Sequence, residues 1–269
     1  TPANERVAGG GGAPNPSLSE AHASFRDPHT LELSTGDELT ADHIVIAAGS
    51  RPHIPDVVAN SGVPFHTSDT VMRIDELPRR VAILGGGYIA AEFAHVFAAF
   101  GAQVSVIARG APLLRHIDHE IAERFTAEVA DRWDLRLRTV VTALSGDADG
   151  VRLELSDGAI IEADLLLVAT GRIPNSDRLD LAAAGVAVNP DGRIVVDANQ
   201  RTSVPHIWAL GDVSSEHQLK HVANHELRVV AHNLAHPDDL ITSDHRFVPS
   251  AVFTHPQLAG VGLTEEQAR

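Results

Sequence analysis

The segment with the clearest capacity for chemistry is a run of small residues after an apolar stretch. Val81 to Leu84 is followed by Gly85, Gly86 and Gly87, and the pattern G-x-G-x-x-G/A closes at Ala90. Gly85 permits a tight turn, Gly87 lets backbone N–H groups approach a pyrophosphate, and Ala90 lets the following helix pack closely. The unpaired N–H groups that begin this helix carry partial positive charge. The run therefore predicts a dinucleotide site.

The end of the next apolar stretch bears on which dinucleotide binds. An acidic residue at that position would accept hydrogen bonds from a ribose 2′-hydroxyl, whereas an arginine receives a 2′-phosphate. Here Val104 to Ile107 is followed by Ala108 and Arg109, and Arg115 comes six residues later. Two guanidinium groups can hold one phosphate with bidentate geometry. We expect NADPH to be preferred over NADH; the alternative is that both arginines are solvated surface residues.

An internal repeat flanks this unit, with the glycine turn lying upstream of the second copy. Residues 31–52 and 153–174 align without a gap and share ten identities in twenty-two positions. Each copy predicts a hairpin followed by an aliphatic strand that ends in Ala-x-Gly. The repeat spacing places the first copy's own glycine turn before Thr1, so we expect a preceding segment to be absent from this chain. Gly9 to Gly12 have no apolar strand before them and are predicted to form a loop or tether.

Composition limits the fold and the partners. The chain has 269 residues, of which 43% are hydrophobic and only 4% aromatic, which suits an α/β protein with buried parallel strands. The net charge of −15 disfavours nucleic acid or an anionic membrane, because either partner needs a basic face. No membrane span or signal peptide is visible, so we expect a cytoplasmic protein. The absence of cysteine excludes a disulfide framework or a thiol nucleophile within these residues.

A further motif carries a family resemblance. Residues 202–213 read Thr-Ser-Val-Pro-His-Ile-Trp-Ala-Leu-Gly-Asp-Val. With the glycine turn and the two Ala-x-Gly segments, this motif resembles the pyridine nucleotide-disulfide oxidoreductases, the family of glutathione reductase, dihydrolipoamide dehydrogenase and mycothione reductase. The resemblance extends from about Ala23 to Arg269. Within the family, segments such as LLRHIDHEI and VPSAVFTHPQLAGVGLTEEQA most resemble the mycothione reductases.

The resemblance implies two cofactors, FAD and NADPH, and contacts for each. It places Asp212 at the ribityl chain of the flavin and the start of a helix near Leu219 at the flavin ring. It makes Tyr88 a gate over the nicotinamide pocket and Glu92 an acid one helical turn further on. It assigns the phosphate of NADPH to the two arginines. The complete set of predicted cofactor-binding residues is Gly85, Gly87, Tyr88, Ile89, Glu92, Arg109, Arg115, Gly171, Ala48, Gly49, Gly211, Asp212, Leu219, Lys220 and His221.

The expected architecture is α/β, with two related Rossmann-like domains and the start of an α+β dimerisation domain. We predict an FAD-domain remnant over 1–68, an NADPH-binding domain over 69–176, a second FAD-domain segment over 177–246 and the start of the dimerisation domain over 247–269. The resemblance also implies a homodimer when the protein is full length.

The family's reaction is not expected from this chain alone. In the family, NADPH reduces the flavin, the flavin reduces an active-site disulfide, and the resulting dithiol opens a small-molecule disulfide. The family's Cys-x4-Cys pair and its His-Glu pair are both absent from this chain. We therefore expect no catalytic residue here and an inactive chain. The family's first FAD-binding glycine turn is also absent, so we expect the isolated chain to hold no flavin and to be colourless.

Other interpretations of the same sequence remain open. The substrate of the intact enzyme is mycothiol disulfide by resemblance, with glutathione disulfide, lipoamide or mercuric ion as alternatives. A noncatalytic module that binds NADPH is an alternative of another class. The pairs His116/His119 and His221/His225 have spacings that suit one helix face. Neither pair has a distant third ligand, so we predict no metal site.

Overall fold

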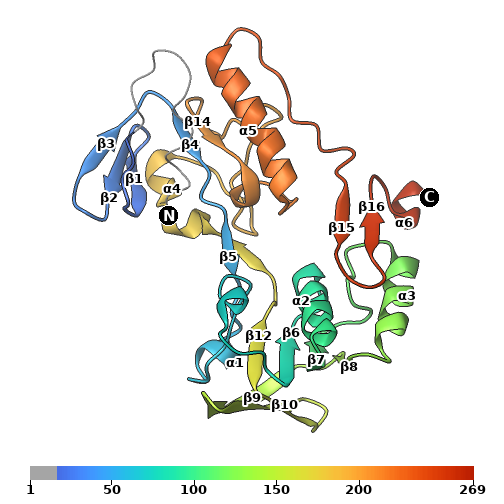
Figure 1. The fold of residues 1–269 in the computed structure, drawn as a ribbon. Helices are drawn as coiled ribbons and strands as arrows, with labels where there is room; N and C mark the ends of the chain where they lie inside the picture. Colours follow the sequence, from blue (N-terminus) through green and yellow to red (C-terminus); the bar gives the residue numbers. More distant parts are fainter. Residues whose placement is uncertain (1–16) are drawn as a thin grey trace.

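The glycine turn lies in a parallel sheet that carries helices on one face. The computed structural model describes residues 17–269, and its largest sheet has the order β12-β6-β7-β8, all parallel (Figure 1). The strands are β12 (Leu165–Val168), β6 (Arg80–Leu84), β7 (Gln103–Ala108) and β8 (Asp134–Leu137). The predicted strand–turn–helix–strand unit is present as β6, α2 (Tyr88–Ala99) and β7. The α/β fold class is therefore confirmed.

Alternate side chains of β6 pack into two hydrophobic clusters, one on each face of the sheet. Val81 and Ile83 pack in a cluster with residues of α2 and α3 (His119–Val129). Ala82 and Leu84 face the other side and pack with residues of a three-stranded antiparallel sheet. That sheet consists of β9 (Val141–Asp147), β10 (Gly150–Leu155) and β11 (Ile160–Ala163). A strand buried on both faces reads as the continuous apolar run seen in the sequence.

The internal repeat appears as two matching sets of elements. The first copy forms β2 (Thr30–Leu33), β3 (Glu38–Thr40), β4 (Ile44–Ile46) and β5 (Ser50–Pro52), and the second forms β10, β11, β12 and β13 (Arg172–Pro174). Both predicted hairpins turn at a glycine with positive φ, +90° at Gly36 and +85° at Gly158. Each hairpin also has a third strand that we did not predict, β1 (Ala23–Asp27) in the first copy and β9 in the second.

The upper and lower parts of the molecule in Figure 1 are joined where the last strands of the two repeat copies meet. Strands β5 and β13 pair antiparallel. Arg51 on β5 holds Asp177 with two hydrogen bonds of 2.8 and 2.6 Å. In the upper part, β14 (Ile207–Ala209) pairs parallel with β4, and the helices are α4 (Leu181–Ala184) and α5 (Lys220–Ala235). Helix α1 (Asp56–Ala59) lies in the lower part. Helix α5 begins where the sequence predicted.

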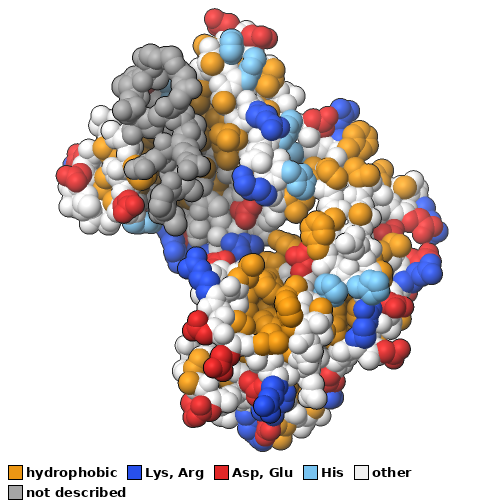
Figure 2. Space-filling model, in the orientation of Figure 1, with side chains coloured by type: hydrophobic (Ala, Val, Ile, Leu, Met, Phe, Trp, Pro, Cys, Tyr) orange, Lys and Arg blue, Asp and Glu red, His pale blue; other side chains and the backbone are white. Residues whose placement is uncertain are grey.

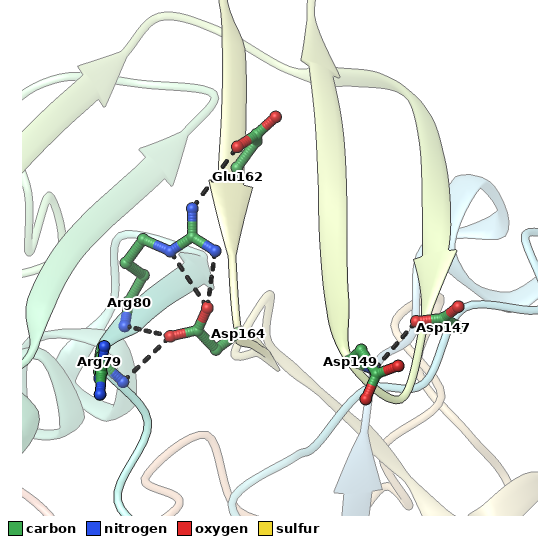
Figure 3. A network of polar contacts seen from close by, with 6 residues as sticks. All are labelled: Arg79, Arg80, Asp147, Asp149, Glu162 and Asp164. Carbon is green, nitrogen blue, oxygen red and sulfur yellow. Dashed lines mark hydrogen bonds and ion pairs between the residues drawn. The ribbon is translucent and has the colours of Figure 1, made fainter.

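One carboxylate of the repeat fastens the strand that carries the glycine turn. Asp164 follows β11, and its side chain accepts hydrogen bonds from the backbone N–H groups of Arg79 and Arg80 at 3.1 and 2.9 Å. The guanidinium of Arg80 donates to the same carboxylate at 2.7 and 3.1 Å and reaches Glu162 at 3.5 Å (Figure 3). Asp164 thus links the first residue of β6 to the connection between β11 and β12.

The C-terminal residues form a hairpin that lies against α2 and α3 (Figure 1). Its elements are β15 (Ser250–Val252), β16 (Leu258–Gly260) and α6 (Glu265–Ala268). Val252 is buried in the cluster that contains α2. The backbone N–H of Phe253 donates to Glu92 at 2.9 Å, and that of Glu265 donates to Asp118 at 2.9 Å. Two carboxylates of the nucleotide unit therefore hold the hairpin.

The predicted domain limits fall within a continuously packed chain. Val58 and Val63 pack on the sheet around β12, and His66 forms a parallel bridge with Leu167. The four domain ranges stay predictions. Gly9 to Gly12, predicted to be a loop or tether, lie outside the described residues. No helix within residues 17–269 is long and apolar enough to cross a membrane.

Candidate nucleotide and flavin sites

The glycine turn has distinct steric demands at its two key positions. Gly85 has a φ of +132°, and a Cβ there would lie 2.1 Å from the carbonyl oxygen of Ala169 at the end of β12. Gly87 has nothing within 4 Å of an added Cβ. Gly85 is therefore required by the packing of β6 against β12, whereas Gly87 leaves open space in front of α2. Ala90 is fully buried, as close packing of α2 requires.

Helix α2 begins without a side-chain cap, and the same is true of α5. By contrast, α3 is capped by Asp118, which accepts from the N–H of Glu120 at 3.1 Å. The first N–H groups of an uncapped helix lack intrahelical acceptors and favour an anion. Among the three longest helices described, the two that lack caps are those predicted to face the cofactors.

A cavity of about 440 Å³ opens in front of α2. Arg109 and Arg115 both line it, as predicted, and both side chains are exposed. A Cβ at Gly110 would lie 2.7 Å from Cζ of Arg115, so the guanidinium lies directly over this glycine. Within residues 17–269 neither arginine forms an ion pair with a carboxylate. The complete lining is Gly86, Gly87, Ala108, Arg109, Gly110, Pro112, Arg115 and His116.

His116 also lines this cavity and carries a titratable imidazole. The sequence analysis did not assign it to this site. It was considered only as a metal ligand on one helix face with His119. The structure contradicts that geometry, because Asp118 caps α3 and the helix begins at His119, leaving His116 in the preceding loop. The available signal was its position directly after Arg115. Its ring contacts Tyr88 edge-on, with centroids 6.2 Å apart and planes at 73°.

Tyr88 lines a second cavity, of about 490 Å³, between α2, the loop before α5 and the C-terminal hairpin. Leu219 is in the same lining. Burial raises the pKa of the Tyr88 hydroxyl; the Asp212 and Glu92 carboxylates add to this effect, and Arg172 opposes it. Figure 2 shows a hollow between the upper and lower parts of the molecule, with hydrophobic side chains gathered on its lower side.

The predicted flavin contact Asp212 lies in a cluster with two residues that we did not predict. The hydroxyl of Ser50 donates to Asp212 at 2.6 Å, and Nε of Arg172 donates to Ser50 Oγ at 2.7 Å. The same Arg172 nitrogen lies 3.9 Å from Asp212. Ser50 and Arg172 are equivalent positions of the repeat, each directly after Ala-x-Gly. That equivalence was the signal that could have identified them.

The remaining predicted residues of the flavin and nucleotide sites line neither of these two cavities. Ala48 and Gly49 offer their carbonyl oxygens to Asn175 at 2.9 and 3.0 Å, and the carbonyl of Gly171 accepts from His53 N–H at 2.9 Å. Gly211 donates its N–H to the buried carboxylate of Glu226 at 2.6 Å. Ile89 lies in the first turn of α2.

Three predicted residues form contacts within the chain. Glu92 lines neither cavity and instead accepts the backbone N–H of Phe253. Lys220 donates to Asn224 at 2.6 Å, and His221 Nε2 lies 2.9 Å from the carbonyl of Pro249. No group of three metal-binding side chains lies together in the part of the chain that the structure describes.

Known proteins resemble this chain over most of its length. A family model described as pyridine nucleotide-disulphide oxidoreductase matches residues 15–227. The chain belongs to this family. It is 53% identical over 265 residues to mycothione reductase of Mycobacterium tuberculosis (strain ATCC 25618 / H37Rv). This match covers 95% of this chain and 58% of the relative. It is 39% identical to glutathione reductase of Burkholderia cepacia, over 95% of this chain and 56% of that one.

Solved structures of the family have the same fold. The HOCl-induced flavoprotein disulfide reductase RclA from Escherichia coli superposes with a TM-score of 0.86 at 32% identity, over 95% of this chain and 59% of that chain. The pyridine nucleotide-disulphide oxidoreductase described here thus spans somewhat over half the length of the relatives that it matches.

Proposed function

We propose that this chain is the nucleotide-binding part of an NADPH-dependent flavoprotein disulfide reductase that acts on mycothiol disulfide. The observation that carries the choice of nucleotide is the cavity in front of the uncapped α2, where Arg109 and Arg115 meet without a carboxylate partner among residues 17–269. In a chain of net charge −15, unpaired arginines beside an open helix start favour a bound anion.

The residues present fit NADPH and part of FAD. The open space at Gly87 leaves room for a pyrophosphate against α2, and the two arginines suit a 2′-phosphate. On the flavin side, Asp212 offers a carboxylate held by Ser50, and the uncapped start of α5 offers N–H groups. Bound FAD would supply the redox chemistry between a pyridine nucleotide and a disulfide. The chain's own residues bind and orient the two cofactors.

The substrate assignment is supported by similarity. The identity of 53% to a mycothione reductase exceeds the 39% to a glutathione reductase. We propose turnover of mycothiol disulfide in preference to glutathione disulfide by a protein that carries the full length of these relatives. Equal turnover of the two disulfides would reject the assignment while leaving the nucleotide proposal intact. Homodimer assembly remains a prediction from the family resemblance, and a cytoplasmic location remains a prediction from the sequence.

The nucleotide proposal is tested by titrating the chain with NADPH and NADH while following nicotinamide fluorescence. Each charged hydrogen-bonded pair contributes about 1.5–3 kcal/mol, so two arginines should favour NADPH by roughly a hundredfold. The double variant Arg109→Ala/Arg115→Ala should lose this preference, and the exposed Arg124→Ala variant should keep it. A preference below about tenfold in the unmodified chain, or one that survives the double substitution, would contradict the proposal.

A further inference from the structure

His116 joins the two cavities of the nucleotide site. Among the residues that the structure describes, it alone lines both the cavity with Arg109 and Arg115 and the larger cavity with Tyr88. Its ring lies edge-on to Tyr88, with centroids 6.2 Å apart. No hydrogen bond or ion pair engages the imidazole within residues 17–269. The ring is therefore available to a ligand while it contacts the residue predicted to gate the nicotinamide pocket.

Both signs of charge surround this imidazole. The arginines are on the phosphate side, and the larger cavity brings further titratable groups from α2, from the start of α3 and from the loop before α5. The groups that line the two cavities with His116 are Arg109, Arg115, Tyr88, Asp118, Glu216 and His217. Although His116 is exposed at the cavity rim, partial burial of its ring lowers its pKa. A neutral ring in the free protein is the expected form at neutral pH.

We propose that His116 is a positioning residue that couples binding of the 2′-phosphate of NADPH to the position of Tyr88. A phosphate dianion held by the two arginines favours the protonated imidazole, which takes its proton from solvent. The charged ring then donates to the phosphate and interacts more strongly with the aromatic ring of Tyr88. This inference rests on the proposed NADPH site and adds a third phosphate-responsive side chain to it.

The sign of the pH dependence follows from the proton uptake. A group whose pKa is higher in the complex than in the free protein strengthens binding fully below its free pKa, and the gain is lost as pH rises through the bound pKa. The preference of the chain for adenosine 2′,5′-bisphosphate over 5′-AMP should therefore fall, by up to roughly tenfold, between about pH 6.5 and 8.5. The arginines stay charged over this range and contribute no such slope.

The chain has a single tyrosine, so a tyrosine-selective NMR label reports Tyr88 alone. Adenosine 2′,5′-bisphosphate carries the 2′-phosphate without a nicotinamide, and 5′-AMP is its control. In the unmodified chain the bisphosphate should shift the Tyr88 signal in step with binding. His116→Gln should still bind the bisphosphate through the arginines but should lose both the shift and the pH slope. His119→Gln, an exposed histidine three residues away, should keep both.

The outcomes separate this inference from the NADPH proposal. Tight bisphosphate binding with an unchanged Tyr88 signal, or an equal shift in His116→Gln, would overturn the coupling and leave the arginine site intact. If the unmodified chain binds the bisphosphate no better than 5′-AMP, both proposals fail. If His116→Gln does not fold, a pH-independent preference of the unmodified chain between pH 6.5 and 8.5 is itself sufficient to reject the coupling.

Discussion

At the scale of single residues, the glycine turn shows that one motif can contain two different constraints. Gly85 is demanded by the protein itself, since its φ of +132° and the nearby carbonyl of Ala169 exclude a side chain. Gly87 has φ of −89° and open space beside it, so only a ligand would require its small size. A sequence pattern treats the two glycines alike. The structure assigns the first to folding and leaves the second to binding.

This difference predicts opposite effects of two alanine substitutions. Gly85→Ala should lower the free energy of unfolding by about 2–4 kcal/mol, because the backbone must shift to admit a Cβ. Gly87→Ala should change stability by less than about 1 kcal/mol and should weaken nucleotide binding. Urea unfolding and NADPH titration of both variants measure the two effects. A stable Gly85→Ala variant, or one that unfolds no more easily than Gly87→Ala, would contradict this interpretation.

At the scale of elements, β6 depends on the carboxylate that precedes β12. Asp164 receives two backbone N–H groups and the guanidinium of Arg80, and the hydrogen bond from Arg80 is the main reason why its pKa is lowered. A carboxyl whose pKa is lower in the folded state stabilises the fold above its unfolded pKa of about 3.9. That stabilisation is lost as pH falls through the folded-state pKa.

Asp164→Asn should therefore destabilise the chain by about 1–2 kcal/mol at neutral pH, since one acceptor oxygen and the charge are removed. The difference from the unmodified chain should shrink below about pH 4. Urea midpoints measured across this pH range test the sign. Asp157→Asn, in the turn between β10 and β11, is the matched control because its carboxylate accepts only a local N–H in that turn. A difference that grows in acid would disprove the assigned role.

At the scale of the whole molecule, the C-terminal hairpin is coupled to the nucleotide unit by two carboxylates. Asp118 caps α3 with one oxygen and accepts from Glu265 at the start of α6 with the other, and the bond from Glu265 is the first cause of its lowered pKa. Glu92 holds Phe253 in the same way. The residue predicted as an acid of the nicotinamide pocket thus contacts the segment predicted to begin a dimerisation domain.

Removing the shared cap should loosen the hairpin selectively. Asp118→Ala should speed amide hydrogen exchange in residues 250–268 and in the first turn of α3, at a cost of about 1 kcal/mol in stability. Exchange in β4 and β14 should not change, because these strands lie in a separate sheet. Thr264→Ala, which removes only the cap of α6, serves as the comparison. Unchanged exchange throughout residues 250–268 would show that Asp118 does not hold the hairpin.

Elements whose signals are local could be predicted from the sequence. Apolar runs such as Val81 to Leu84 predicted β6, the glycine pattern predicted the turn into α2, and the repeat predicted two hairpins, because each depends on residues that are neighbours in the chain. The positions of Arg109 and Arg115 beside that turn followed from the same βαβ geometry, and the family was recognisable from contiguous motifs.

Contacts between residues far apart in the sequence depend on how the segments pack. Ser50 and Arg172 reach Asp212 because β5 and β13 pair where the last strands of the two repeat copies meet. Glu92 meets Phe253 across 161 residues of chain. His116 lies in the loop before α3, because Asp118 caps that helix and the helix begins at His119. In this loop His116 lines both cavities. Periodicity and spacing describe neighbours along one chain segment, whereas these contacts depend on how separate segments pack, a property that no local pattern contains.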